Sequence, residues 1–232
     1  MSGRRRISEE RRTQILEAAV DVIGQRGLAD TRIADIAERT GTSSALVVYY
    51  FQTKERLLAE ALAFSEERFY AQTQDELDVI PTAIGQLVRL LQLSCAAGAP
   101  RGEWIEEWVL WLDLWSRAYR DPEVAKDREA MDLRWRETIA EIVRRGQASG
   151  EFTTDADADD FALLLASLVD GLAIQVVLRD PEVTAARMFQ VCLDMAAREL
   201  GFEIPAAVRP KRSARSRAPR GAGAAAKRTA DG

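Results

Sequence analysis

Histidine is absent from the 232 residues of this chain, and cysteine occurs only twice, at Cys95 and Cys192. Without histidine, the chain lacks the most common general base and a frequent zinc ligand. The usual activation of a serine or cysteine nucleophile by an imidazole is excluded too. We therefore predict no catalytic residue and no metal site. An all-helical enzyme that uses carboxylates is the alternative, which a panel of hydrolase and transferase assays would test.

Glycine-rich phosphate loops and uninterrupted apolar runs of about 18 residues are also absent from the sequence. No nucleotide cofactor is therefore predicted, and neither membrane insertion nor export is indicated, so we expect a cytoplasmic protein. Each cysteine lies within an apolar run with helical spacing. This position predicts buried free thiols, with a disulfide as the alternative.

The net charge of -5 is distributed unevenly along the chain. Residues 1–57 carry a net charge of +2, residues 58–204 carry -14, and residues 205–232 carry +7. A segment that binds DNA must therefore depend on the local placement of its basic residues, because the central region repels phosphate. The basic segment from Pro205 onward has almost no large apolar side chain, which predicts a disordered tail.

Apolar residues recur with helical spacing over most of the chain, and no long alternation with period two predicts a sheet. The first helix is expected from Ser8 to Gly27. Thr31 is expected to cap a short second helix, and Ser43 to cap a third that covers Ser44 to Tyr49. A fourth helix is expected from Thr53 to about Asp78, followed by helices at 82–97, 102–119, 122–148, 156–178 and 182–200. The predicted fold class is all-α, with about nine helices.

The segment from Thr31 to Leu58 combines capping residues, a turn and aromatic residues at characteristic positions. These are Thr31, Asp35-Ile36-Ala37, Gly41, Ser43, Tyr49-Tyr50-Phe51 and Thr53-Lys54-Glu55. The combination resembles the helix-turn-helix signature of the TetR family of transcriptional regulators, from which Thr42 and Val48 depart. The resemblance implies a repressor that binds double-stranded operator DNA as a dimer and releases it when a small-molecule effector binds.

The third helix is the expected recognition helix. Because the major groove is read by residues near the N-terminus of such a helix, the candidates for base contact are Ser43, Ser44, Ala45 and Val47. Phosphate contacts are expected from Thr31, Arg32, Tyr49, Tyr50 and Lys54. The alternative for Tyr49 is a place in the core, where Ile36, Leu46 and Phe51 are expected.

Residues 156–200 resemble the last two helices of BetI-like, choline-responsive members of this family. Their apolar residues occupy more than one helix face, so both helices need a second partner. The resemblance implies that this partner is the same helix pair of another subunit, giving a homodimer with a four-helix interface.

Trp104, Trp108, Trp111 and Trp115 form one stripe along the helix predicted at 102–119, and Glu107 borders the stripe. Indole faces attract alkylammonium groups, which favours a cationic effector bound by Trp104, Glu107, Trp108 and Trp111. The alternative is an ordinary aromatic core. Asp170 lies in an otherwise apolar helix, where it is either a pocket residue or one end of an internal ion pair.

These expectations divide the chain into three parts. Residues 1–52 are the predicted DNA-binding domain, residues 53–204 the ligand-binding and dimerisation domain, and residues 205–232 the basic tail. A pure interaction scaffold is the second alternative function. Such a scaffold would show no salt-dependent DNA binding, whereas a dimeric DNA reader loses affinity steeply as salt rises.

Overall fold

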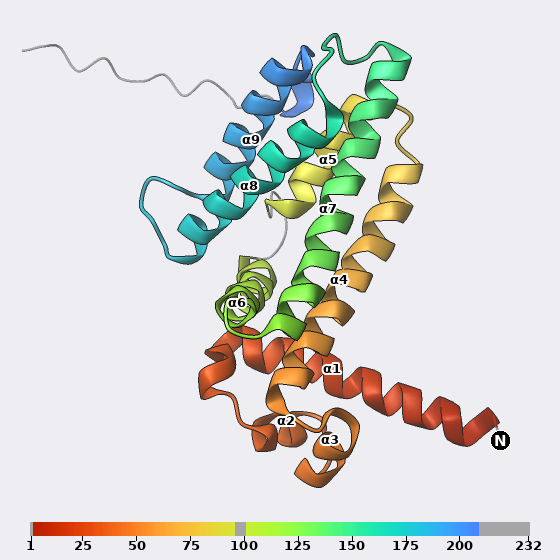
Figure 1. Cartoon of the computed structure of the whole chain (residues 1–232), viewed down its shortest axis with the longest axis vertical. Coiled ribbons are helices and arrows are strands. Elements are labelled where there is room, and N and C mark those ends of the chain that lie inside the picture. The colour runs from red at the N-terminus through yellow and green to blue at the C-terminus, as the bar shows by residue number, and fades with distance from the viewer. Residues whose placement is uncertain (1, 96–100, 209–232) are drawn as a thin grey trace, which may run out of the picture.

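The computed structural model describes residues 2–95 and 101–208, and within these ranges it contains nine α-helices, one short 3-10 helix and no strand (Figure 1). The all-α prediction is confirmed. The helices are α1 (Ser2–Asp30), α2 (Ile33–Arg39), α3 (Ser44–Phe51), α4 (Lys54–Asp78), α5 (Ala83–Ser94), α6 (Arg101–Ala118), α7 (Pro122–Ser149), α8 (Ala158–Val177) and α9 (Ala185–Leu200). The 3-10 helix covers Ala206–Val208, and the remainder of the predicted tail lies outside the described residues.

Local capping chemistry explains why α4 to α9 begin and end close to their predicted bounds. The Thr53 side chain accepts a hydrogen bond from the Arg56 N–H at the start of α4. Asp121 caps α7, and Pro122 occupies its first position. Gly150 ends α7 in the left-handed conformation with φ of 77°, which glycine adopts without steric cost.

The first two helices differ from the prediction at their ends. Helix α1 begins at Ser2 rather than Ser8, and Gly27 breaks it with φ of 76° and ψ of 157°. The residue that precedes α2 as its N-cap is Arg32, not Thr31. Thr31 is fully buried, and its hydroxyl donates to the Gly27 carbonyl at 2.8 Å. The threonine therefore closes the break in α1 instead of opening α2.

The buried apolar residues form two clusters. One cluster fills an N-terminal unit, which we define as α1 to α3 with the first half of α4. The other fills the body, defined as α5, α7, α8 and α9 with the second half of α4. Helix α6 joins them, because Trp104 belongs to the body cluster while Leu110 and Leu114 belong to the N-terminal cluster. The N-terminal core thus extends past residue 52, where the sequence predicts a domain boundary.

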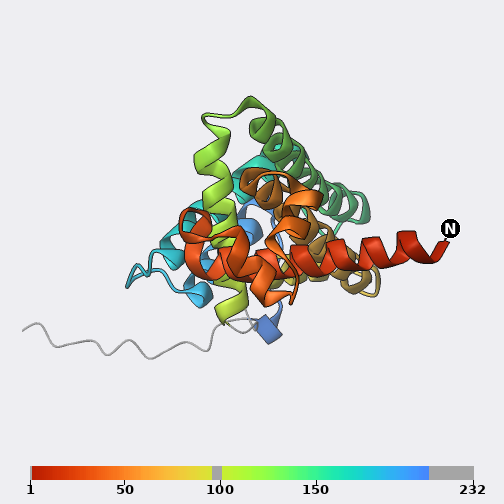
Figure 2. The same cartoon turned by 90° about the horizontal axis from the view of Figure 1, so that it is seen from below.

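The arrangement of α6 is plain in two views of the molecule. The body helices stand side by side above the N-terminal unit, with α6 between the two (Figure 1). Seen from below, α6 crosses α1, with which it is in contact (Figure 2). Both cysteines lie in the body core as buried free thiols, which confirms that prediction.

Helix α8 is the most apolar helix of the body. An 18-residue window within it has a mean hydropathy of 1.8, and only 33% of that window is buried in the monomer. By length and composition α8 is the one helix of the described ranges that is able to cross a membrane, a test that core helices also pass. Leu163 and Leu164 are half exposed on it.

Candidate DNA-reading helix and ligand cavity

The exposed face of α3 consists of Ser44, Ala45, Val48 and Tyr49. The Ser43 hydroxyl oxygen accepts a hydrogen bond from the Leu46 N–H, so the predicted cap is confirmed. Val48 is 46% exposed and Tyr49 is 76% exposed. Because residues four apart lie on one helix face, these side chains form a single surface at the edge of the molecule.

Val47 does not belong to this surface, which corrects one predicted base contact. Its side chain is fully buried in the core of the N-terminal unit. The exposed neighbour is Val48, whereas Leu46, expected in the core, is only half-buried. Six consecutive apolar or aromatic residues, from Leu46 to Phe51, leave the amphipathic pattern of so short a helix undefined.

The predicted phosphate-binding residues differ in whether their side chains are exposed, buried or already hydrogen-bonded within the protein. Arg32 and Tyr49 are exposed. Thr31 is buried and cannot reach a phosphate, which corrects that prediction. The Lys54 ammonium donates to the Ala29 and Thr31 carbonyls at 3.3 and 2.6 Å and so secures the end of α1. The Tyr50 hydroxyl is hydrogen-bonded to Ser8 at 3.1 Å. Phosphate contact by Arg32, Tyr49, Tyr50 or Lys54 stays a prediction.

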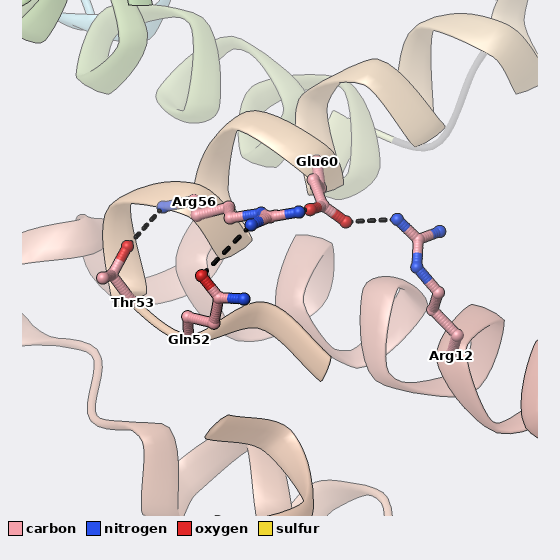
Figure 3. A network of polar contacts seen from close by, with 5 residues as sticks. All are labelled: Arg12, Gln52, Thr53, Arg56 and Glu60. Atoms are coloured by element: carbon pink, nitrogen blue, oxygen red, sulfur yellow. Dashed lines mark hydrogen bonds and ion pairs between the residues drawn. The ribbon is translucent and has the colours of Figure 1, made fainter. Parts of the chain in front are cut away.

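A network of polar side chains fixes the turn after α3 to α1 and α4 (Figure 3). Arg56 donates to Gln52 at 3.2 Å and to Glu60 at 2.9 Å, and the Glu60 carboxylate also pairs with Arg12 of α1. Gln52 has a φ of 63°, a conformation that costs a residue other than glycine some free energy. The network therefore holds the recognition helix in one orientation relative to α1 and α4.

A cavity of about 430 Å³ lies between α6 and the body. Residues of α4 to α8 line it, and they include all five predicted ligand residues: Trp104, Glu107, Trp108, Trp111 and Asp170. Trp115 and Trp135 also line the cavity, although the sequence analysis assigned them no such role. Trp115 was detectable as the fourth member of the stripe, whereas Trp135 lies on α7 and gave no local signal.

The four tryptophans of α6 form a continuous wall. The ring centroids are 5.8 Å apart for Trp104 and Trp108, 6.0 Å for Trp108 and Trp115, and 6.1 Å for Trp111 and Trp115. The Trp104 indole N–H donates to the Ser94 carbonyl at 2.8 Å. Trp104 is nearly buried, but Trp108 and Trp111 are only partly buried. The stripe therefore packs against the cores and also lines a cavity, and the binding of a ligand by these tryptophans stays a prediction.

Acidic side chains occupy other walls of the cavity. Asp132 forms an ion pair with Arg128 at 3.0 Å, whereas Asp170 has no ion pair among the described residues. Burial, with the nearby Asp132 charge, raises the pKa of Asp170 to about 7, although Arg128 opposes the shift. Burial likewise raises the pKa of Glu66 and of Asp132. The cavity thus contains a carboxylate, Asp170, that forms no ion pair with any described residue and whose ionisation burial opposes.

Helix α6, which forms one wall of the cavity, also contacts α1 beside the break at Gly27. The Asp113 carboxylate accepts a hydrogen bond from the Leu28 N–H at 2.7 Å, immediately after Gly27. A Cβ atom at Gly24 would lie 2.6 Å from Glu106 Cβ and 2.9 Å from its carbonyl oxygen, so the two helices touch along their backbones. Because no layer of flexible side chains separates the two helices here, a displacement of α6 is transmitted directly to α1.

Comparison with known proteins gives two family matches that together span most of the chain. Residues 15–61 match the model described as bacterial regulatory proteins, tetR family, and residues 84–201 match BetI-type transcriptional repressor, C-terminal. The HTH-type transcriptional regulator BetI of Cronobacter sakazakii is 25% identical over 72% of this chain and 80% of its own length. The regulator PksA of Bacillus subtilis is 28% identical over 80% and 87%.

Among the similar solved structures is one that contains bound choline. It is a putative transcriptional regulator from Saccharomonospora viridis in complex with choline. That protein has a TM-score of 0.74 and 36% identity to this chain, and the match covers 82% of this chain and 96% of the other. The family resemblance noted in the sequence is therefore confirmed at both ends of the fold.

Proposed function

This chain belongs to the TetR family of bacterial transcriptional regulators, with a BetI-type C-terminal domain, and we propose that it is a repressor released from operator DNA by a cationic small molecule. The observation that carries the proposal is the double role of α6. One helix supplies the aromatic wall of the cavity and enters the core beneath the recognition helix. Its relatives are transcriptional regulators, which supports a role other than catalysis.

The exposed face of α3 supports DNA recognition by the N-terminal unit. We assign base contacts to Ser43, Ser44, Ala45 and Val48, with Val48 in place of Val47 because only its side chain is accessible. Phosphate contacts are assigned to Arg32 and Tyr49, and a cytoplasmic location follows from contact with DNA. The DNA-binding domain then comprises 1–52, with a core completed by α4 and α6 of the ligand-binding domain.

The apolar surface of α8 supports dimerisation through α8 and α9. Leu164 is half exposed, and Leu168, Leu172 and Val176 are only partly buried in the monomer, whereas the half-exposed Leu163 lines the cavity. Exposed apolar surface on this scale marks an interaction site, and a twofold arrangement satisfies the same face on both subunits. In the dimer, the two α3 helices would lie about 34 Å apart to occupy successive major grooves.

The cavity supports a cationic ligand for two reasons. Indole faces attract ammonium groups, and the Asp170 carboxylate adds a charge that no described residue pairs with. A ligand that binds one orientation of α6 more tightly shifts the DNA-binding equilibrium by that difference in affinity. The shift reaches the N-terminal unit through α4 and through the contact of α6 with α1.

A DNA-release titration tests this proposal. A binding sequence is first selected from random duplexes, and the complex is then titrated with choline, with uncharged alcohols and with carboxylates. We expect choline to release the DNA and Trp111→Ala to raise the choline concentration required, with unchanged DNA affinity in the absence of ligand. Release by carboxylates alone, with the variant behaving like the wild type, would contradict the proposed cation site.

A further inference from the structure

The cavity is longer than a choline-sized cation. Its lining extends along α6 from Trp104 to Trp115, which at 1.5 Å per residue corresponds to about 16 Å. Its volume of about 430 Å³ equals that of roughly 14 liquid waters. Choline, a trimethylammonium group on a short alcohol, would occupy one part of this length.

Charge is concentrated toward one part of the cavity. Asp170 of α8 lies close enough to Asp132 and Arg128 of α7 for both charges to act on it, and Asp132 also acts on Glu66 of α4. Arg136 of α7 lies in the same group. Glu107 of α6 is exposed and accepts a hydrogen bond from the Ser65 hydroxyl at 3.4 Å.

Many other residues that line the cavity are uncharged. Here α5 contributes Leu93 and Ser94, and the Ser94 carbonyl is already engaged by the Trp104 indole. Phe69 lines the cavity from α4 and stacks edge to face with Trp135, with ring centroids 6.2 Å apart. Such a surface gains binding free energy from alkyl groups but offers little to a second charge.

We infer that the cavity binds an amphiphilic monocation whose quaternary ammonium group lies against Asp170 and whose alkyl chain extends along the tryptophan wall toward Trp104. The inference rests on the proposed function and specifies its ligand class. We match one cationic group to Asp170 because the other carboxylates of the lining already have partners or nearby positive charges. Arg128 pairs with Asp132, the Arg134 charge acts on Glu66, and Glu107 is exposed and accepts a hydrogen bond from Ser65. An alkyl chain of several carbons displaces water that would remain in the cavity beside bound choline.

A series of alkyltrimethylammonium ions tests both the ammonium site and the alkyl-chain site in the full-length protein. Tetramethylammonium, choline, butyltrimethylammonium and octyltrimethylammonium are titrated by tryptophan fluorescence and by calorimetry. All five tryptophans line the cavity, so the fluorescence reports its occupancy directly. Each buried methylene is expected to tighten binding roughly three- to fourfold. Octyltrimethylammonium should therefore bind at least about 100-fold more tightly than tetramethylammonium.

Matched probes and variants separate charge from size. Octanol and octanoate carry the same chain without the cation, and spermidine carries several charges without the chain. Because the attraction between Asp170 and a quaternary ammonium is Coulombic, Asp170→Asn should weaken octyltrimethylammonium binding by about 10-fold or more. The binding of octanol should change much less. Asp155→Asn removes one exposed carboxylate outside the cavity and controls for net charge.

The outcomes distinguish the inference from the proposed function. If choline binds as tightly as octyltrimethylammonium, or if longer chains bind more weakly, the inference is overturned while the cation site stands. If octanol binds as tightly as the octyl cation, or spermidine more tightly, the single ammonium site is wrong. Binding of octanoate alone, or of no probe, would overturn both.

Discussion

Polar side chains secure helix ends in both the N-terminal unit and the body, but the body also places Asp170 in a cavity. In the N-terminal unit, Lys54 and Thr31 donate to backbone carbonyls, and the Leu28 N–H donates to Asp113 of the neighbouring α6. Each of these bonds closes a break or an end of α1. In the body, Asp170 faces a cavity without an ion pair. The N-terminal unit is therefore held in a single geometry by its own side chains, whereas we propose that a ligand completes the cavity of the body.

The largest effect should follow from a polar group placed in the N-terminal core. Val47→Asn buries an unsatisfied amide and should lower the free energy of unfolding by about 4 kcal/mol. Val48→Asn is the matched control, since its side chain is 46% exposed, and should change stability by less than about 0.5 kcal/mol while altering DNA sequence preference. Urea denaturation and DNA selection measure the two effects. Equal destabilisation by both variants would contradict the burial of Val47.

The next largest effect should be a pH-dependent change in the free energy of unfolding that arises from Asp170 in the body. Because the folded-state pKa of Asp170 is raised to about 7, the folded protein binds this proton more tightly than the unfolded chain. The contribution of this bound proton to the free energy of unfolding is therefore lost as pH rises from about 4 to about 7. Relative to Asp170→Asn, the wild type should lose about 2–3 kcal/mol between pH 5 and pH 8. Denaturation of both proteins at several pH values tests this.

The same ionisation couples cation binding to pH. The charged groups that line the cavity with Asp170 are Glu66 on α4, Glu107 on α6, and Arg128, Asp132 and Arg136 on α7, of which Asp132 and Arg128 act on Asp170. A bound cation favours the deprotonated form of Asp170, so the affinity for octyltrimethylammonium should rise from pH 6 to pH 8 and the protein should release a proton. In Asp170→Asn this dependence should be weaker. An identical dependence in both proteins would assign it to another group.

A smaller effect is expected where the two regions meet. Asp113→Ala leaves the Leu28 N–H without its partner, which should cost about 1–2 kcal/mol, and should reduce the change in DNA affinity caused by the ligand. Gly24→Ala forces α1 and α6 apart and should reduce that coupling independently. The ratio of DNA affinities with and without ligand is the measurement. Full coupling in both variants would exclude the contact of α6 with α1 as a route.

The smallest effect is expected from the exposed part of the network beside α3. Glu60→Gln weakens the interactions with Arg12 and Arg56 but keeps the shape of the side chain. Since these groups are partly exposed, stability should fall by less than about 1 kcal/mol. The matched control is Glu137→Gln, which removes a similar partner of Arg144 in the body. Only the first variant should also weaken DNA binding, measured at constant salt.

Much of this architecture was predictable because its signals are local. Capping residues and proline positions located α5 to α9 to within a few residues, and the spacing of Trp104, Trp108, Trp111 and Trp115 placed them on one face. The predictions failed where local patterns are ambiguous. The unbroken run of apolar and aromatic residues from Leu46 to Phe51 has no periodicity that distinguishes the buried Val47 from the exposed Val48. Thr31 has the residue type of a helix cap but is recruited by the break at Gly27.

The sequence by itself determined the helices, the family and the tryptophan stripe, since each depends on residues close together in the chain. Only the tertiary structure decided that the stripe faces a cavity, that Trp135 of α7 joins it, and that Asp170 meets the charges of Arg128 and Asp132. It also decided that α6 belongs to two cores and that Asp113 bonds to Leu28. Such contacts join residues far apart along the chain, and their geometry arises from helix packing, which helical periodicity does not specify.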